Sequence, residues 1–188
     1  MVQTLDLTPH PAFHPALVTG VSVRWSLLDD GRLMLRYRVD GAQALVVPPF
    51  KGHGKADELW KTTCFELFLY DGEGRYREFN FSPNGQWALY SFAGYRNRAG
   101  DALLRDHPDI KHEQGASMFV QTVFVDSTIL LGAERAALAA VILGSALLGG
   151  GGGPAPMPST MPSASASPSA TALATAAPSP VAGPVEDG

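Results

Sequence analysis

Apolar and polar residues alternate along two neighbouring stretches near the start of the chain. Between residues 21 and 27, valine, tryptophan and leucine occupy every second position, with serine or arginine between them. Residues 33–39 resume this alternation after a turn formed by Asp29, Asp30 and Gly31. Because successive side chains of a strand point to opposite faces, each stretch predicts a strand with one apolar face. Together they predict a β-hairpin.

A second hairpin is predicted over residues 62–70 and 76–82, joined by the glycine-containing turn 71–74. If Tyr70 opposes Tyr76, one face of this hairpin is apolar and the other combines polar with aromatic residues. A slip of one residue would bring acidic side chains into the apolar layer, so this register is the predicted one. It gives the pairs Phe65–Phe81 and Leu67–Phe79 on the apolar face, and Glu66–Asn80 and Phe68–Glu78 on the other.

Further short strands follow along the chain. The turn signal at residues 83–85 precedes an aromatic-rich stretch over 86–92, and β-branched and aromatic residues return over 118–126. Residues 95–115 between them are predicted to form a long polar loop. Repeated short strands separated by turns favour an all-β fold, and we expect an antiparallel β-sandwich.

Two regions are less clear, and the end of the chain is unlike the rest. Residues 44–47 are compatible with a short strand, which the prolines at 48–49 would end or place at an edge. Residues 132–148 carry both helix-favouring and strand-favouring residues, so helix and strand stay open. Five glycines at 149–153 are followed by proline, alanine, serine and threonine, so we expect residues 143–188 to form a disordered tail.

Charge and cysteine content narrow the function classes. The net charge of −4 offers no basic surface for nucleic acid or an anionic membrane. Cys64 is the only cysteine, which excludes an intrachain disulfide and a cysteine-rich zinc site. Residues 1–13 lack the basic and apolar pattern of a secretory signal, and the apolar stretch 136–148 is too short to span a membrane. We therefore expect a cytoplasmic protein.

The predicted second hairpin also carries a motif. Residues 59–69 are Leu-Trp-Lys-Thr-Thr-Cys-Phe-Glu-Leu-Phe-Leu, and residues 76–88 are Tyr-Arg-Glu-Phe-Asn-Phe-Ser-Pro-Asn-Gly-Gln-Trp-Ala. Together with Tyr-Ser-Phe-Ala-Gly-Tyr-Arg at 90–96, this block resembles the bacterial DOMON-like domains related to family 9 carbohydrate-binding modules. Weaker similarity extends from about residue 5 to residue 142. The resemblance implies an antiparallel β-sandwich over residues 1–142 that holds a sugar or, as in cytochrome-type relatives, haem.

The chain departs from this family pattern after Ile142. The family would continue with a glycine turn and closing strands, whereas here the low-complexity tail begins. We interpret the carboxy-terminal segment as a replacement, with a shift of reading frame as one hypothesis. The sandwich would then lack closing strands and keep an unpaired edge, and an inactive remnant is one alternative.

The candidate site combines flat aromatic rings with polar side chains. Tryptophan and tyrosine rings can cover the apolar face of a sugar while carboxylates and amides bind its hydroxyls. As the resemblance to DOMON-like domains implies, we predict non-catalytic binding of a carbohydrate-type small ligand, without a cofactor or a metal. Trp87 is equally compatible with a place in the core. The predicted ligand-binding residues are Trp60, Glu66, Glu78, Asn80, Trp87, Tyr95 and Arg96.

Two other functions stay open. Glu66 and Glu78 would be the carboxylate pair of a glycosidase-like enzyme. The second is haem binding, whose axial ligands would come from His10, His14, His53, His107, His112, Met34 and Met118.

Cys64 lies within a strand, where a buried structural thiol is its expected role. The oligomeric state is not predicted.

Overall fold

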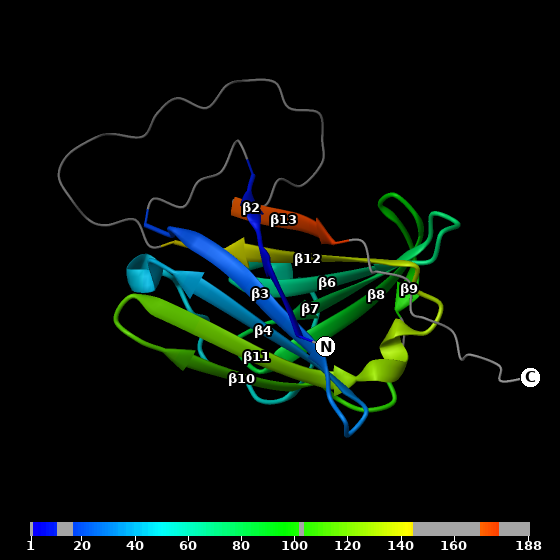
Figure 1. Ribbon diagram of the computed structural model, residues 1–188, viewed down its shortest axis with the longest axis horizontal. Coiled ribbons are helices and arrows are strands. Elements are labelled where there is room, and N and C mark those ends of the chain that lie inside the picture. The colour runs from blue at the N-terminus through cyan, green and yellow to red at the C-terminus, as the bar shows by residue number, and fades with distance from the viewer. Residues whose placement is uncertain (1, 11–16, 102–103, 145–169, 177–188) are drawn as a thin grey trace, which may run out of the picture.

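Two β-sheets packed face to face make up the fold (Figure 1). The computed structural model describes residues 2–10, 17–101, 104–144 and 170–176. Within these ranges every element is a strand or a short 3₁₀ helix, so the predicted all-β sandwich is confirmed. The 3₁₀ helices are η1 (Ala42–Ala44), η2 (Leu59–Lys61) and η3 (Ser127–Leu130).

The first sheet is antiparallel and is built around the predicted amino-terminal hairpin. Val23 pairs with Tyr37 and Trp25 with Leu35, as the alternation of these stretches requires. Gly31 closes the turn with a φ of 80°, a conformation that favours glycine. In order across the sheet, the strands are β1 (Val2–Asp6), β3 (Gly20–Leu27), β4 (Arg32–Asp40), β11 (Met118–Asp126) and β10 (Asp109–Gln114).

The second sheet contains the predicted β6–β7 hairpin, whose register is confirmed at all four predicted pairs. All its strand pairs are antiparallel except β5 with β8, which is parallel. In order across the sheet, the strands are β2 (Thr8–Pro9), β13 (Ala170–Ala176), β12 (Arg135–Ile142), β6 (Cys64–Tyr70), β7 (Tyr76–Phe81), β8 (Gln86–Gly94) and β5 (Gly54–Lys55), with β9 (Asn97–Asp101) also beside β8.

The inner faces of the two sheets form the core. Phe65 stacks on Phe119 across the sandwich, with ring centroids 5.9 Å apart. Two side chains of the first sheet also donate hydrogen bonds to main-chain carbonyls of the second. The Tyr37 hydroxyl donates to the Glu66 carbonyl over 2.9 Å, and the Gln121 amide donates to the Phe81 carbonyl over 3.0 Å. The β6–β7 hairpin is thus held to the first sheet by both apolar packing and buried hydrogen bonds.

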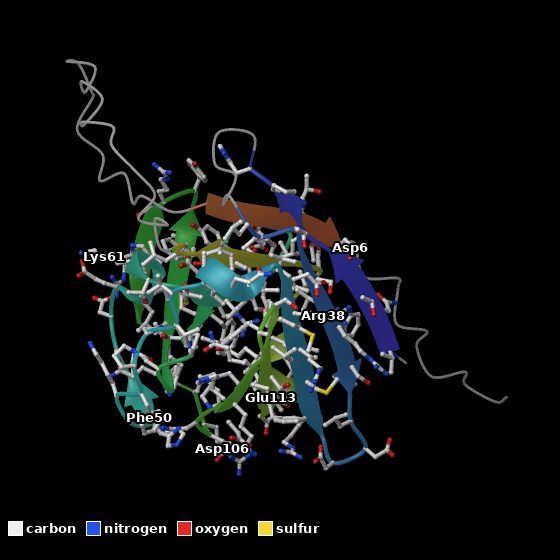
Figure 2. All side chains as sticks on the ribbon, turned by 90° about the vertical axis from the view of Figure 1, so that its left-hand side faces the viewer. Asp6, Arg38, Phe50, Lys61, Asp106 and Glu113 are labelled. Atoms are coloured by element: carbon white, nitrogen blue, oxygen red, sulfur yellow. The ribbon has the colours of Figure 1, made fainter. Side chains whose placement is uncertain are left out.

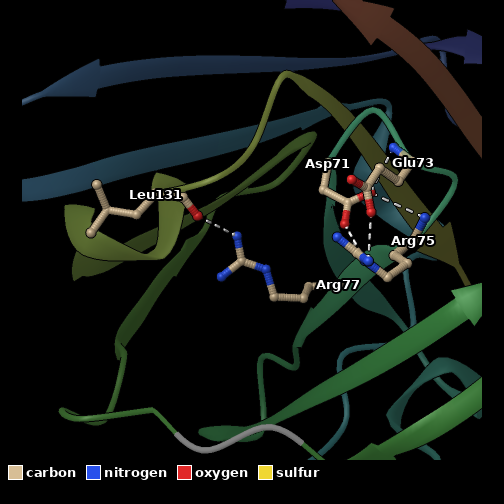
Figure 3. Close-up of polar contacts among 5 residues, drawn as sticks. All are labelled: Asp71, Glu73, Arg75, Arg77 and Leu131. Carbon is tan, nitrogen blue, oxygen red and sulfur yellow. Dashed lines mark hydrogen bonds and ion pairs between the residues drawn. The ribbon is translucent and has the colours of Figure 1, made fainter.

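Charged side chains fix the turn between β6 and β7 and the start of β7 (Figure 3). Arg75 bridges the carboxylates of Asp71 and Glu73, with nitrogen–oxygen distances of 2.5 and 2.6 Å. Arg77 donates a hydrogen bond of 3.1 Å to the carbonyl of Leu131, just after η3. These exposed contacts are individually weak, but they agree with the register of the hairpin.

Three regions differ from the sequence-based expectation. The predicted loop 95–115 contains two strands, β9 and β10. The stretch 44–47 is no strand, although Leu45 forms an isolated bridge to Gly144. The ambiguous stretch 132–148 supplies β12, whose pairing with β6 decides the question in favour of a strand.

The edge beyond β12 also differs from the expectation. Residues 170–176, predicted to belong to the unstructured tail, form β13 and pair antiparallel with β12 along its length. The expected open edge of β12 is therefore occupied. The rest of the predicted tail after Gly144 lies outside the described residues. In the part of the chain that is described, no helix is long and apolar enough to span a membrane.

Replacing a core ring tests this packing. Phe79 is fully buried between the sheets, so Phe79→Ala is expected to lower the free energy of unfolding by about 3–5 kcal/mol. The matched control is Leu131→Ala, because Leu131 is 73% exposed and its truncation should change stability by less than about 0.5 kcal/mol. Urea denaturation measures both, and equal losses would contradict the inward placement of Phe79.

Candidate functional site

The outer face of the second sheet gathers acidic, amide and aromatic side chains. Because side chains alternate along a strand, the residues of β6 and β7 that do not face the core share this face. The register places Glu66 beside Asn80 and Phe68 beside Glu78, and Tyr90 of β8 lies on the other side of Glu78. Residues of this outer face are Cys64, Glu66, Phe68 and Tyr70 of β6, Tyr76, Glu78 and Asn80 of β7, and Ala88, Tyr90 and Phe92 of β8.

The segment of residues 50–61, which precedes β6, covers part of this face. Figure 2 shows Phe50 and Lys61, near its two ends, on the opposite side of the molecule from Arg38 of the first sheet. The segment carries η2, whose Leu59 packs into a small apolar cluster with Cys64, Ala88, Tyr90 and Val141.

Two contacts to Tyr90 hold this covering segment in place. The half-buried Trp60 meets Tyr90 edge to face, with ring centroids 5.6 Å apart. The Tyr90 hydroxyl donates a short hydrogen bond to the carboxylate of Asp57. Trp60 therefore lies at the outer face, and its role in stacking on a ligand stays a prediction.

Asn80 links Glu78 to Cys64 of the neighbouring strand β6. Its side-chain amide donates to Glu78 Oε1 over 2.8 Å, and its oxygen accepts a weak hydrogen bond from the Cys64 thiol over 3.5 Å. Asn80 is completely buried, so both contacts fix the orientation of its amide. The buried thiol of Cys64 thus has a structural role here, as expected.

Glu66 is a buried acid with no neutralising partner among the described residues. Its side chain is 5% exposed, and no opposite charge is among the groups that shift its pKa. Burial, and secondarily the charge of Glu78, raise the pKa of Glu66 from 4.5 to about 8. At neutral pH this carboxyl is therefore mostly protonated and can both donate and accept hydrogen bonds.

Glu78 has a different environment. Burial raises the pKa of its carboxyl group, but the hydrogen bond from Asn80 and the nearby charge of Arg98 oppose this shift. The arrangement therefore places a neutral acid and a more readily ionised acid on one face, which suits recognition of a ligand with several polar groups.

Aromatic rings line the end of the face away from Trp60. Tyr76 stacks on Phe92 with centroids 4.4 Å apart and planes inclined by 6°, and Tyr76 also contacts Tyr70. The guanidinium of Arg98 lies 4.3 Å from the centre of the Tyr90 ring. The alternation of side chains along the strands, which placed Glu66 and Glu78 on this face, also predicts these rings there, so they could have been included in the predicted site. Arg98 had no such signal, because its strand was predicted as a loop.

Trp87 faces the core instead of the outer face, which corrects its prediction as a ligand-binding residue. It pairs with Phe81 on the inner face, is 5% exposed and belongs to the core. Its position agrees with the other role that the sequence allowed, which is packing in the core.

Tyr95 and Arg96 form the turn between β8 and β9. Tyr95 is 85% exposed, and the Arg96 guanidinium lies 5.3 Å from the centre of its ring. Burial raises the pKa of Tyr76 and the main chain of Arg96 opposes this shift, so the turn adjoins the aromatic end of the outer face. These two residues lie at the rim of the candidate site and not with the acids.

Three of the histidines considered for haem ligation contact different aromatic partners. His53 lies against Phe50, His107 against Trp87, and His112 of β10 against Phe119. Met34 and Met118 are on the first sheet, and His14 lies outside the described residues. In the described ranges, no three histidine, cysteine or acidic side chains cluster closely enough to hold a metal ion.

Comparisons with known proteins support the fold alone. A scan against protein-family models found no match. A search of curated proteins found none either. Among solved structures, the fold is similar to that of a candidate carbohydrate-binding protein from Bacteroides uniformis, with a TM-score of 0.55 and 14% sequence identity. The similarity covers 93% of this chain and 77% of that one.

The buried acid predicts a specific pH dependence of stability. Between pH 4.5 and about 8 the folded state keeps a proton on Glu66 that the unfolded state releases. This contribution is full below the unfolded pKa and is lost as the pH rises through the folded pKa. Relative to Glu66→Gln, the natural protein should therefore lose up to about 1.4 kcal/mol per pH unit over this interval.

Urea denaturation at several pH values between 5 and 8 measures this difference. Glu113→Gln is the control, because Glu113 lies on the first sheet with an exposed side chain and should leave the pH profile unchanged. Parallel profiles for the natural protein and Glu66→Gln would contradict the burial of Glu66.

Proposed function

We propose that the outer face of the second sheet binds a small carbohydrate-type ligand without reacting with it. The observation that carries this proposal is the Glu66 side chain, which is 5% exposed, lies beside Asn80 and diagonal to Glu78, and has no opposite charge among the groups that shift its pKa. Burial makes the charged form of this acid costly, and a ligand that binds the carboxyl or supplies a counter-charge offsets that cost. Such groups are more typical of a binding site than of a purely structural sheet surface.

The surrounding side chains suit a sugar. An aromatic ring such as Trp60 can cover the C–H face of a pyranose, while carboxyl groups bind its hydroxyls. The protonated Glu66 can donate and accept, and an ionised Glu78 can only accept. Tyr95 and Arg96 are proposed as contacts at the rim, where a ligand longer than one ring would extend.

Two likenesses support this proposal. The motifs around Trp60 and the β6–β7 hairpin resemble DOMON-like domains, and the fold is similar to that of the candidate carbohydrate-binding protein from Bacteroides uniformis. Membership of the DOMON-like family is part of the proposal. Residence in the cytoplasm and the absence of nucleic-acid and membrane partners stay predictions from the sequence.

Glycoside hydrolysis is a second candidate, favoured by one observation. The sequence offers no sign of separate environments for the two acids, but the structure gives Glu66 a dry site and Glu78 a hydrogen bond and a nearby cation. Unequal environments of this kind can separate a general acid from an ionised carboxylate.

Tryptophan fluorescence tests the binding proposal. Titration with a panel of mono- and disaccharides is expected to give saturable quenching that is lost in Trp60→Ala, with affinity reduced about tenfold in calorimetry. Trp25→Phe is the matched control, because Trp25 is on the first sheet and should leave the quenching intact. Quenching that survives in Trp60→Ala would remove Trp60 from the site.

Incubation with aryl glycosides separates binding from hydrolysis. The binding proposal predicts no release of the aryl group above the rate in buffer. Turnover that disappears in both Glu66→Gln and Glu78→Gln would instead establish the glycosidase.

A further inference from the structure

The two acids of the outer face are near neighbours with few cations around them. Glu66 opposes Asn80, and Glu78 is two residues from Asn80 along β7, so the two carboxyl-bearing residues are diagonal neighbours. Diagonal residues of paired strands have their Cα atoms about 7–8 Å apart, within reach of a single small group placed between their side chains. The pair could therefore share one ligand group.

Nearby cations are engaged with other partners. Lys61 of η2 forms an ion pair of 2.7 Å with Glu58. Arg135 of β12 lies over the ring of Tyr70, and Arg98 over the ring of Tyr90. Of these, only Arg98 acts on the acidic pair, through Glu78. Within the described ranges, neither Glu66 nor Glu78 forms an ion pair.

Aromatic rings flank the pair and add to its affinity for positive charge. Phe68 and Tyr90 lie on the two sides of Glu78 across the sheet. The faces of such rings attract cations, and the position of Arg98 over Tyr90 is an instance on this same surface. A neutral sugar would use only the hydrogen-bonding capacity of the acids, whereas an ammonium group would also use their charge and the rings.

We propose that the pair Glu66 and Glu78 receives an ammonium group of the ligand, so that the carbohydrate bound here is an amino sugar. This inference rests on the proposed binding function. No covalent bond forms or breaks. As the ammonium enters, the carboxyl group of Glu66 releases its proton to solvent and becomes the counter-ion of the ligand.

Isothermal titration calorimetry with D-glucosamine, N-acetyl-D-glucosamine and D-glucose tests the proposal at a pH where the amine is charged. Glucosamine is expected to bind about tenfold more tightly than either uncharged sugar. Its apparent enthalpy should vary with the ionisation enthalpy of the buffer, because a proton is released, and that of D-glucose should not. Equal affinities for the three sugars would overturn the inference and leave the binding function standing, whereas no binding of any sugar would overturn both.

Glu66→Gln keeps the shape of the protonated side chain but cannot become charged. This variant is expected to lose the preference for glucosamine over D-glucose and the proton release. Glu113→Gln, an exposed acid of the first sheet, should keep both. A preference that persists in Glu66→Gln would place the ammonium elsewhere and overturn the proposal. If Glu66→Gln does not melt cooperatively, Glu78→Gln tests the preference alone, and it is expected to lose the preference for glucosamine.

Discussion

The pairing of β6 with β7 decides which side chains of the second sheet enter the sandwich and which face outward. Since strand side chains alternate, a slip of β7 by one residue against β6 would turn Glu78 into the sandwich and expel Phe79 and Phe81. Burying carboxyl groups there would cost several kcal/mol, in addition to the lost apolar packing. Hydrogen bonds from the first sheet to the main chain of this hairpin require the same register. The β6–β7 register therefore determines both the core and the candidate site.

The outer face is also partly dry, which gives its acids their chemistry. The segment with Leu59 and Trp60 lies over the strands and removes water from a surface that would otherwise be solvated. An acid in such a place keeps its proton or needs a partner. The fold thus keeps at Glu66 a nearly buried acid whose pKa no opposite charge lowers.

Prediction from the sequence succeeded for strands that have one apolar face buried in the core. The hairpins β3–β4 and β6–β7 carry strong alternation, and their registers follow from it. Edge strands were missed because they bury little: β10 has a single buried residue, so it looks like a polar loop. Residues 170–176 form a strand that pairs with β12, although their composition does not predict one. Glu66, Glu78, Asn80 and Trp60 come together on the predicted face. Trp87 does not, because an aromatic residue on a strand has the same sequence pattern whether it stacks on a ligand or fills the core.

Carbon-13 NMR of the glutamate side-chain carboxyl groups, followed over pH, tests the central claim most directly. If the β6–β7 register buries Glu66 on the outer face, its carboxyl resonance titrates near pH 8 and that of Glu78 above its ordinary value of 4.5. A saturating ligand at the site should then shift both titrations. Two glutamates that titrate at their ordinary values, as fully solvated side chains do, would contradict the account.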